Sequence, residues 1–194
     1  MHGTAFAGEL AIRTQGMLLM RIGYYSDFFA YPVLIAVFGA AGVMNAGADG
    51  GEAWIAFFLC GLALWTLLEY VLHRFVLHHM PFIKEMHEQH HRDVHALIGT
   101  PTWLSVVLFL GFVFCPLLRL TDFATASAVS CGLVTGYLWY VSVHHAVHHW
   151  HPAHSGYLYS VKRGHAMHHA DEANNFGVTS RFWGRVFGTM RRLQ

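Results

Sequence analysis

The sequence predicts an all-α integral membrane protein with a polar helical cap at one face of the bilayer. Hydrophobic residues make up 55% of the 194 positions, and the mean hydropathy of +0.38 is high for a soluble domain. Four apolar segments account for this composition, and sixteen of the 17 histidines lie between or after them, in blocks 73–95 and 144–169. We expect one domain over 1–194, because this length leaves little room for a second fold.

Each apolar segment is long enough to cross a bilayer as a helix. A hydrocarbon core of ~30 Å needs about 20 helical residues, within a range of ~17–25. The alternative, a bundle of buried helices in a soluble protein, would require four such segments in one short chain. Brief polar turns at 45–52 and 121–122 join the segments in pairs, which predicts two helical hairpins within 28–143. The four segments are Phe28–Met44, Ala53–Leu72, Trp103–Leu120 and Phe123–Val143.

The remaining segments are polar, and we expect them to lie at the membrane surface. Residues 1–27 mix polar and apolar positions and predict an N-terminal interfacial segment. Residues 73–102 connect the two hairpins and contain the first histidine block. Residues 144–194 are too polar to span the bilayer, and their regularly placed aromatics and glycines predict a folded cap.

Basic residues predict the orientation of the chain. Eleven of the 12 lysines and arginines lie in the N-terminal stretch, in 73–102 or in the C-terminal stretch, and Arg119 is the exception. Under the positive-inside rule, both termini and both histidine blocks face the cytoplasm. The formal net charge is +1, and no dense basic stripe is present, which excludes nucleic acid as a partner.

The histidines form four spaced clusters that predict a metal centre. Neutral imidazole is the commonest protein metal ligand, and residues three or four apart share one face of a helix. Ten imidazoles exceed what one ion accepts, so we expect two ions, each with about five nitrogens and an open position. Nitrogen ligands favour iron, zinc or copper over magnesium or calcium. The ten predicted ligands are His73, His78, His87, His90, His91, His144, His148, His165, His168 and His169.

Other polar residues near these clusters are expected to support the ligands. Metal-bound imidazoles commonly donate their second N–H to a carboxylate or carbonyl. The predicted supporting residues are His79, His95, His145, His149 and Asp171, with Glu69, Glu88, Asp93 and Glu172 as further candidate acceptors. His145 and His149 have the same spacing as His144 and His148, so either pair satisfies the pattern.

A non-catalytic metal-binding or metal-transport protein is the alternative from a different functional class. Transporters place ionisable groups near the bilayer midplane, where they line a path. The apolar segments here contain almost none, apart from Glu69 near the end of the second segment. The histidines instead lie at the membrane edge, which favours chemistry at the surface over translocation.

The order of the clusters, H-x4-H, H-x2-HH, H-x3-H and H-x2-HH, resembles the fatty acid hydroxylase/sterol desaturase superfamily of membrane di-metal oxygenases. A second motif, Asn175-Phe176-Gly177-Val178-Thr179-Ser180, and the later Phe187-Gly188-Thr189 strengthen the likeness. The Gly-Val-Thr-Ser sequence at 177–180 is most similar to the fatty acid 2-hydroxylase branch. This resemblance covers roughly residues 55–190.

The resemblance implies four transmembrane helices under a cytoplasmic cap that holds two metals at the ten histidines. It also implies O2-dependent hydroxylation of a membrane lipid acyl chain, in particular 2-hydroxylation of a fatty acid or sphingolipid. Iron is the expected working metal, and zinc is possible in the isolated protein. Sterol-type desaturation and carotenoid hydroxylation use the same centre and remain alternatives.

The resemblance further implies a lipid channel and a redox partner. No cytochrome b5-type segment is evident, so we expect electrons from a separate donor of the cytochrome b5, ferredoxin or reductase type. Apolar residues near the junction of helices and cap are expected to line the acyl channel. They are Trp65, Leu68, Leu72, Phe75, Trp139 and Tyr140.

Overall fold

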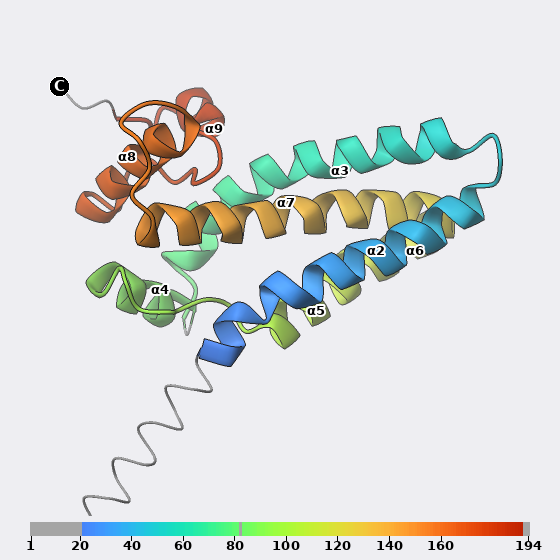
Figure 1. The fold of residues 1–194 in the computed structure, drawn as a ribbon, viewed down its shortest axis with the longest axis horizontal. Coiled ribbons are helices and arrows are strands. Elements are labelled where there is room, and N and C mark those ends of the chain that lie inside the picture. The colour runs from blue at the N-terminus through green and yellow to red at the C-terminus, as the bar shows by residue number, and fades with distance from the viewer. Residues whose placement is uncertain (1–20, 82, 192–194) are drawn as a thin grey trace, which may run out of the picture.

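The computed structural model describes residues 21–81 and 83–191, and all regular secondary structure in these ranges is helical. The long helices run side by side, while α4, α8 and α9 gather at one end of the bundle (Figure 1). This arrangement confirms the predicted all-α class. In chain order the elements are α2 (Asp27–Ala46), α3 (Gly51–Val71), η1 (Leu72–Leu77), α4 (Ile83–Arg92), α5 (Thr102–Phe109), η2 (Leu110–Phe114), α6 (Cys115–Leu120), α7 (Phe123–His149), α8 (Tyr157–Ala170) and α9 (Phe182–Val186).

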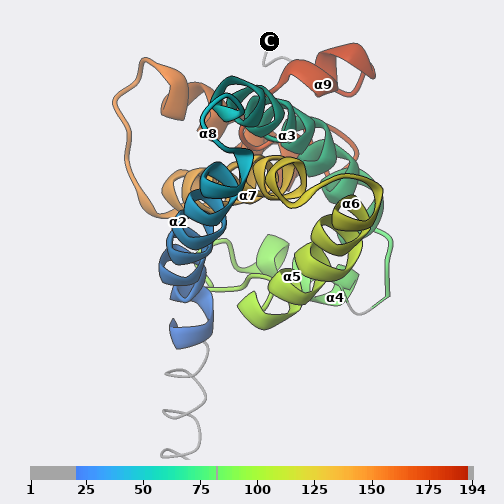
Figure 2. The ribbon, with the colours of Figure 1, turned by 90° about the vertical axis from the view of Figure 1, so that its right-hand side faces the viewer.

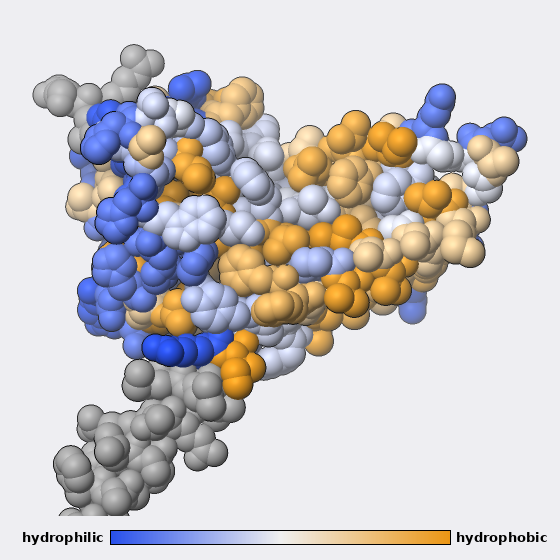
Figure 3. Space-filling view, in the orientation of Figure 1, coloured by the Kyte–Doolittle hydropathy of each residue, from blue (hydrophilic) through white to orange (hydrophobic). Residues whose placement is uncertain are grey.

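Four continuous helical stretches are long and apolar enough to cross a membrane, as predicted. They are Arg21–Ala46, Gly51–Leu77, Thr102–Leu120 and Phe123–His149. Hydrophobic side chains cover the length of the bundle, and hydrophilic ones gather at the end formed by α4 and α8 (Figure 3). The protein is therefore a membrane protein. Most of the predicted interfacial segment 1–27 lies outside the described residues.

Local signals explain where the hairpins turn. Gly47 follows α2 with a φ of 72°, a left-handed conformation that glycine adopts without steric cost. Asp122 precedes α7, and its carboxylate accepts a hydrogen bond of 2.9 Å from the backbone N–H of Thr125. This contact satisfies one of the free donors at the helix N-terminus. Both turns lie where the sequence predicted them.

The second and fourth membrane helices continue beyond their predicted apolar segments into the histidine blocks. The second runs on through η1 to Leu77, and the fourth runs to His149 rather than to Val143. No glycine or proline interrupts either extension, so the backbone stays helical after the apolar pattern ends. His73, His144 and His148 are therefore carried on the ends of membrane helices rather than on separate segments of the cap.

Helix α7 lies at the centre of the bundle, against both α2 and α3 (Figure 2). Close contact with α3 depends on residues without a side chain. A Cβ atom at Gly61 would lie 2.2 Å from the carbonyl oxygen of Val129, and one at Gly132 would lie 2.1 Å from that of Phe58. Small residues at helix interfaces let backbones approach in this way. The contact sets the axial register of α3 against α7.

A buried carboxylate joins the helices just below the polar end. Asp27 of α2 accepts hydrogen bonds from the hydroxyl of Thr102 at 2.5 Å and from that of Tyr137 at 2.8 Å. Beside it, the hydroxyl of Tyr31 donates to Ser105 at 2.6 Å. Since a buried polar group without partners is costly, these bonds hold α2, α5 and α7 in one arrangement.

We predict that Gly132→Ala destabilises the protein strongly, because the added methyl group would overlap the α3 backbone. Overpacking of this kind typically costs about 1–3 kcal/mol. Gly111→Ala is the matched control, since none of the described residues lies within 4 Å of a Cβ at that position. Thermal unfolding in detergent should show a lower melting temperature for the first variant alone. Equal melting temperatures would contradict the close contact.

Candidate metal centre

The ten predicted ligands lie together at the polar end of the bundle, in two groups. In the first histidine group, all five ligand nitrogens lie within 4.8 Å of one another. Four residues of the second group meet the same limit, and His169 adjoins them with its Nε2 3.1 Å from that of His165. The first group is His73, His78, His87, His91 and His168, and the second is His90, His144, His148, His165 and His169.

A π-helical turn brings the first pair of histidines together. His73 and His78 are five residues apart, which on a regular α-helix places them about 140° apart around the axis. The segment η1 instead has the wider i→i+5 spacing of a π-helix. The two imidazole rings consequently stack, with centroids 5.4 Å apart and planes within 9°. The unusual x4 spacing is therefore matched to an unusual turn.

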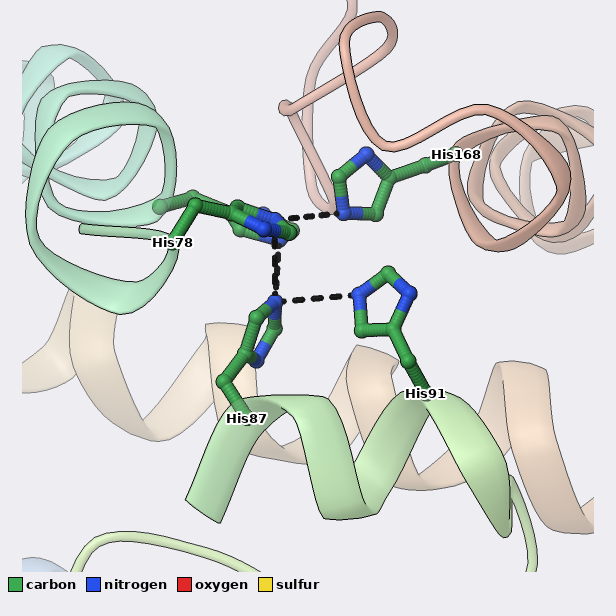
Figure 4. Close-up of side chains that lie close together, drawn as sticks. His78, His87, His91 and His168 are labelled. Atoms are coloured by element: carbon green, nitrogen blue, oxygen red, sulfur yellow. Dashed lines mark hydrogen bonds between the residues drawn. The ribbon is translucent and has the colours of Figure 1, made fainter. Parts of the chain in front are cut away.

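Each H-x2-HH motif divides its histidines between the two groups. In α4, His87 and His91 point into the first group, as Figure 4 shows, whereas His90 belongs to the second. In α8 the division is reversed, because His168 belongs to the first group and the other two histidines to the second. Each of the two helices thus contributes histidines to both groups.

The ring nitrogens in each group approach one another too closely for ordinary hydrogen bonding. The Nε2 atom of His87 lies 3.1–3.2 Å from the Nε2 atoms of three other histidines of its group. In the second group, the Nε2 atom of His148 lies 2.9 Å from that of His165 and 3.2 Å from that of His144. A neutral imidazole has one donor and one acceptor nitrogen, so one Nε2 atom cannot bond to three others.

Hydrogen bonds at the outer nitrogens turn the Nε2 lone pairs inward. The Nδ1 atom of His73 lies 2.6 Å from the carbonyl oxygen of Phe176, and that of His168 lies 2.7 Å from the carbonyl oxygen of Asn174. Because a carbonyl oxygen only accepts, both Nδ1 atoms carry the proton and both Nε2 atoms are bare acceptors. A carboxylate, Glu172, lies 3.4 Å from the Nδ1 atom of His91.

The separations between the ring nitrogens can be compared with those expected if each histidine group binds one metal ion. Two nitrogens bound at about 2.1 Å and at roughly a right angle on one ion stand about 3.0 Å apart. The observed separations of 2.9–3.2 Å match that value. Converging lone pairs repel one another unless a cation lies between them. Within the described residues, both ring nitrogens of buried His90 also lack any hydrogen-bond partner. The donor set fits two nitrogen-ligated ions.

Burial keeps these imidazoles in the neutral form that binds metals. Burial, together with a smaller contribution from neighbouring imidazoles, lowers the pKa of His90 to about 4, of His168 to about 3 and of His169 to about 2. At neutral pH the rings are therefore uncharged, and no proton has to leave before a metal binds. Burial also lowers the pKa of His78, His87, His91 and His165.

The predicted supporting histidines lie apart from both groups. His79 and His95 are exposed, and the ring of His95 lies 5.9 Å from that of His149. His145 has its Nδ1 atom 3.0 Å from the hydroxyl of Tyr24. No hydrogen bond within the described residues joins these four histidines to a member of either group. The pair on α7 that faces the second group is accordingly 144 and 148.

Asp171 contacts the loop that follows α8 and not an imidazole ring of either group. Its carboxylate accepts a hydrogen bond of 2.8 Å from the side-chain amide of Asn174 and pairs with Arg191 at 2.5 Å. The carbonyl of Asn174 is the group that contacts His168. Backbone acceptors such as this one have no sequence signature, so only the folded chain could identify them.

Polar side chains of α3 bind the C-terminal segment, a contact that was not predicted from the sequence. Thr66 accepts a hydrogen bond of 3.0 Å from the indole of Trp183, and the hydroxyl of Tyr70 lies 2.9 Å from that of Thr189. With Glu69 and His73, these α3 residues occupy positions i, i+3, i+4 and i+7, which share one helix face. This row of polar residues on one face of an apolar helix is the sequence pattern that could have predicted the contact. Glu69, proposed as a partner for a histidine, hydrogen-bonds instead to Val178 and Thr179.

A cavity of about 90 Å³ adjoins both histidine groups. His87, His90 and His144 form one wall, and the remaining wall is largely apolar and aromatic. Of the six predicted channel residues, Tyr140 lines this cavity. Trp65 is packed in the core, and Phe75 and Trp139 are 52% and 53% exposed. The other lining residues are Tyr24, Phe28, Leu77, Ile83, Met86, Ile98, Gly99, Thr100, Tyr137 and Val141.

Comparisons with known proteins place this arrangement in a family. Residues 58–189 match the family model of the fatty acid hydroxylases. The chain is 32% identical over 140 residues to a dihydroceramide fatty acyl 2-hydroxylase of Arabidopsis thaliana, covering 67% of this chain and 58% of that protein. It is 34% identical over 148 residues to the fatty acid 2-hydroxylase of Homo sapiens, covering 69% and 39%. The chain thus spans about half the length of the relatives it matches, or less.

A solved structure shows the same fold. The structure of full-length Scs7p, in which only the hydroxylase domain is visible, superposes with a TM-score of 0.73. The sequence identity is 24%, and the match covers 88% of this chain and 67% of the other. The ceramide very long chain fatty acid hydroxylase scs7 of Schizosaccharomyces pombe is 34% identical over 148 residues, which cover 70% of this chain and 42% of that protein.

We predict that single ligand removals lower metal content one ion at a time. His87→Ala removes a nitrogen from the first group, and His148→Ala removes one from the second. Each variant should purify with about one zinc ion instead of two after loading, measured by mass spectrometry of the metal. His95→Ala is the control, because that exposed ring contacts neither group. Full metal content in both ligand variants would contradict the assignment.

Proposed function

The chain belongs to the fatty acid hydroxylase family, and on this premise we propose that it is an O2-dependent di-iron hydroxylase of membrane lipid acyl chains. We further propose that it attacks carbon 2 of a fatty acid or sphingolipid acyl group. One observation supports the proposal most directly: ten imidazoles in two groups border a largely apolar cavity at the end of a membrane bundle.

The reaction class follows from the ligands and the family. Two iron ions held by the histidine groups would supply the redox chemistry that activates O2 and inserts one oxygen atom into a C–H bond. Zinc would occupy the same nitrogens but has no redox chemistry, so iron is the working metal in this proposal. Hydroxylation consumes O2, two electrons and two protons and releases water beside the alcohol. A donor of the cytochrome b5, ferredoxin or reductase type would supply the electrons.

The cavity provides a place for an acyl chain beside the histidines. Attack at carbon 2 requires the polar end of the lipid to lie near the metals and the tail to extend away from them. Tyr24, Thr100 and Tyr137 offer hydroxyl groups around the cavity, while Phe28 and Ile98 offer apolar surface. Binding sites of this kind are mostly apolar with a few polar groups that fix orientation.

A second, smaller apolar cavity lies further along the bundle and would receive part of the tail. Its volume is about 40 Å³, and it lies between α2, the α5–η2 region and α7. Tyr31 and Phe109 line it, and both rings pack against Tyr137, which lines the first cavity. The tail would thus run between helices of the bundle, where a lipid can enter without leaving the bilayer.

We expect a lipid product one oxygen atom heavier when the wild type is expressed with a redox partner, detected by lipid mass spectrometry. His168→Ala should abolish it. Ile98→Trp should also reduce it strongly while leaving metal content unchanged, because the larger side chain takes up cavity volume and removes no histidine ligand. A product lighter by two hydrogen atoms would indicate desaturation, and no lipid change at all would contradict an oxygenase.

We also propose that the histidine groups face the cytoplasm. Four spans place Arg21 and Arg191 on the same side of the membrane. In the sequence, eleven of the 12 basic residues belong to the N-terminal stretch, to 73–102 or to the C-terminal stretch. Positive residues are retained in the cytoplasm during insertion. The two hairpin turns would then face the opposite side of the membrane.

Cysteine labelling of intact cells checks this orientation. A membrane-impermeant maleimide should label Asp49→Cys, in the exposed turn before α3, in a background without the native cysteines. It should label Ser155→Cys, in the exposed loop before α8, only after permeabilisation. The reverse pattern would place the histidines outside the cytoplasm.

A further inference from the structure

We propose that Glu69 is a positioning residue for the first histidine group. It holds the loop 174–179, whose carbonyl groups determine which nitrogen of His73 and of His168 faces the other members of the group. This inference rests on the proposed two-ion site and concerns a carboxylate that contacts none of the ten histidines directly.

Glu69 is buried on α3, with 3% of its surface exposed, and uses both oxygens on the loop. Its Oε1 atom accepts the backbone N–H groups of Val178 at 2.7 Å and Thr179 at 2.8 Å. Its Oε2 atom accepts the hydroxyl of Thr179. The turn is tight, since a Cβ atom at Gly177 would lie 2.0 Å from the carbonyl oxygen of Ser180. This carboxylate thus satisfies three donors that would otherwise be buried without partners.

The other end of the loop contacts the histidines. Asn175 has a φ of 56°, a left-handed conformation that asparagine tolerates better than most residues. Its backbone N–H donates to the carbonyl of Thr189 at 2.9 Å. The carbonyl groups on either side of it, those of Asn174 and Phe176, accept from Nδ1 of His168 and of His73. One loop therefore sets the tautomer of two rings that come from different helices.

The effect of the loop is confined to one group. Both histidines that it contacts belong to the first group, at whose centre their Nε2 atoms lie near those of His78 and His87. In the second group, the Nδ1 atoms of His165 and His169 have no hydrogen-bond partner within the described residues. Loss of the Glu69 contacts should therefore weaken the binding of the ion in the first group and leave the binding of the other ion unchanged.

Release of zinc to a chelator tests this asymmetry. In the zinc-loaded wild type we expect two ions to leave slowly. In Glu69→Gln, one ion should leave faster, by up to the roughly 10–100-fold by which loss of a ligand's hydrogen-bonding partner lowers metal affinity, while the second keeps its wild-type rate. Cobalt(II)-loaded protein should show altered absorption bands for one of its two ions.

Two controls separate positioning from general destabilisation. Thr66→Val removes a different bond between α3 and the C-terminal segment and should keep both wild-type release rates. If Glu69→Gln does not fold, Thr179→Val removes the hydroxyl bond to Glu69, and Thr179→Ser should restore wild-type release. Equal acceleration of both ions, or of neither, would overturn the inference. A wild type that binds fewer than two zinc ions would instead overturn the two-ion site.

Discussion

The convergence of unprotonated imidazole nitrogens is the constraint on which the rest of the structure depends. In each group one Nε2 atom lies within 3.2 Å of those of two or three other histidines, and the lone pairs repel one another unless the surrounding chain is rigid or a cation is bound. The glycine contact between α3 and α7, the π turn of η1 and the loop 174–179 all supply that rigidity. The π turn brings the rings of His73 and His78 together, and the loop orients His73 and His168. The glycine contact fixes the helices α3 and α7 against each other.

The ligand sets interlock across four segments. Because α4 and α8 each contribute to both groups, neither group can be assembled without these two helices, and both groups together orient them. His91 and His169 stack at 4.2 Å where the groups meet. The membrane bundle and the helices at its polar end are therefore parts of one unit, and the cavity that borders both groups lies between α2, α4 and α7.

Much of the fold and the residue content of the site could be predicted from the sequence. Helix length, turn residues and histidine spacing are local properties, so the four spans and the ten clustered histidines were predictable. The helical continuation through His144 and His148 was not, because the apolar pattern ends before the backbone helix does. The choice between that pair and His145 with His149 needed the direction of α7, and the packing of Trp65 in the core depends on contacts between distant segments.

By itself, the sequence determined which side chains are available: apolar segments of membrane length, and imidazoles at spacings that suit helices. Only the tertiary structure decided how they are used. The division of each H-x2-HH motif between two groups depends on the angles at which α4 and α8 meet the bundle. The acceptors for His73 and His168 are backbone carbonyls of a distant loop, and Glu69 serves that loop rather than a histidine. Carbonyl directions and helix angles arise from contacts between residues far apart in the chain, and no local pattern records them.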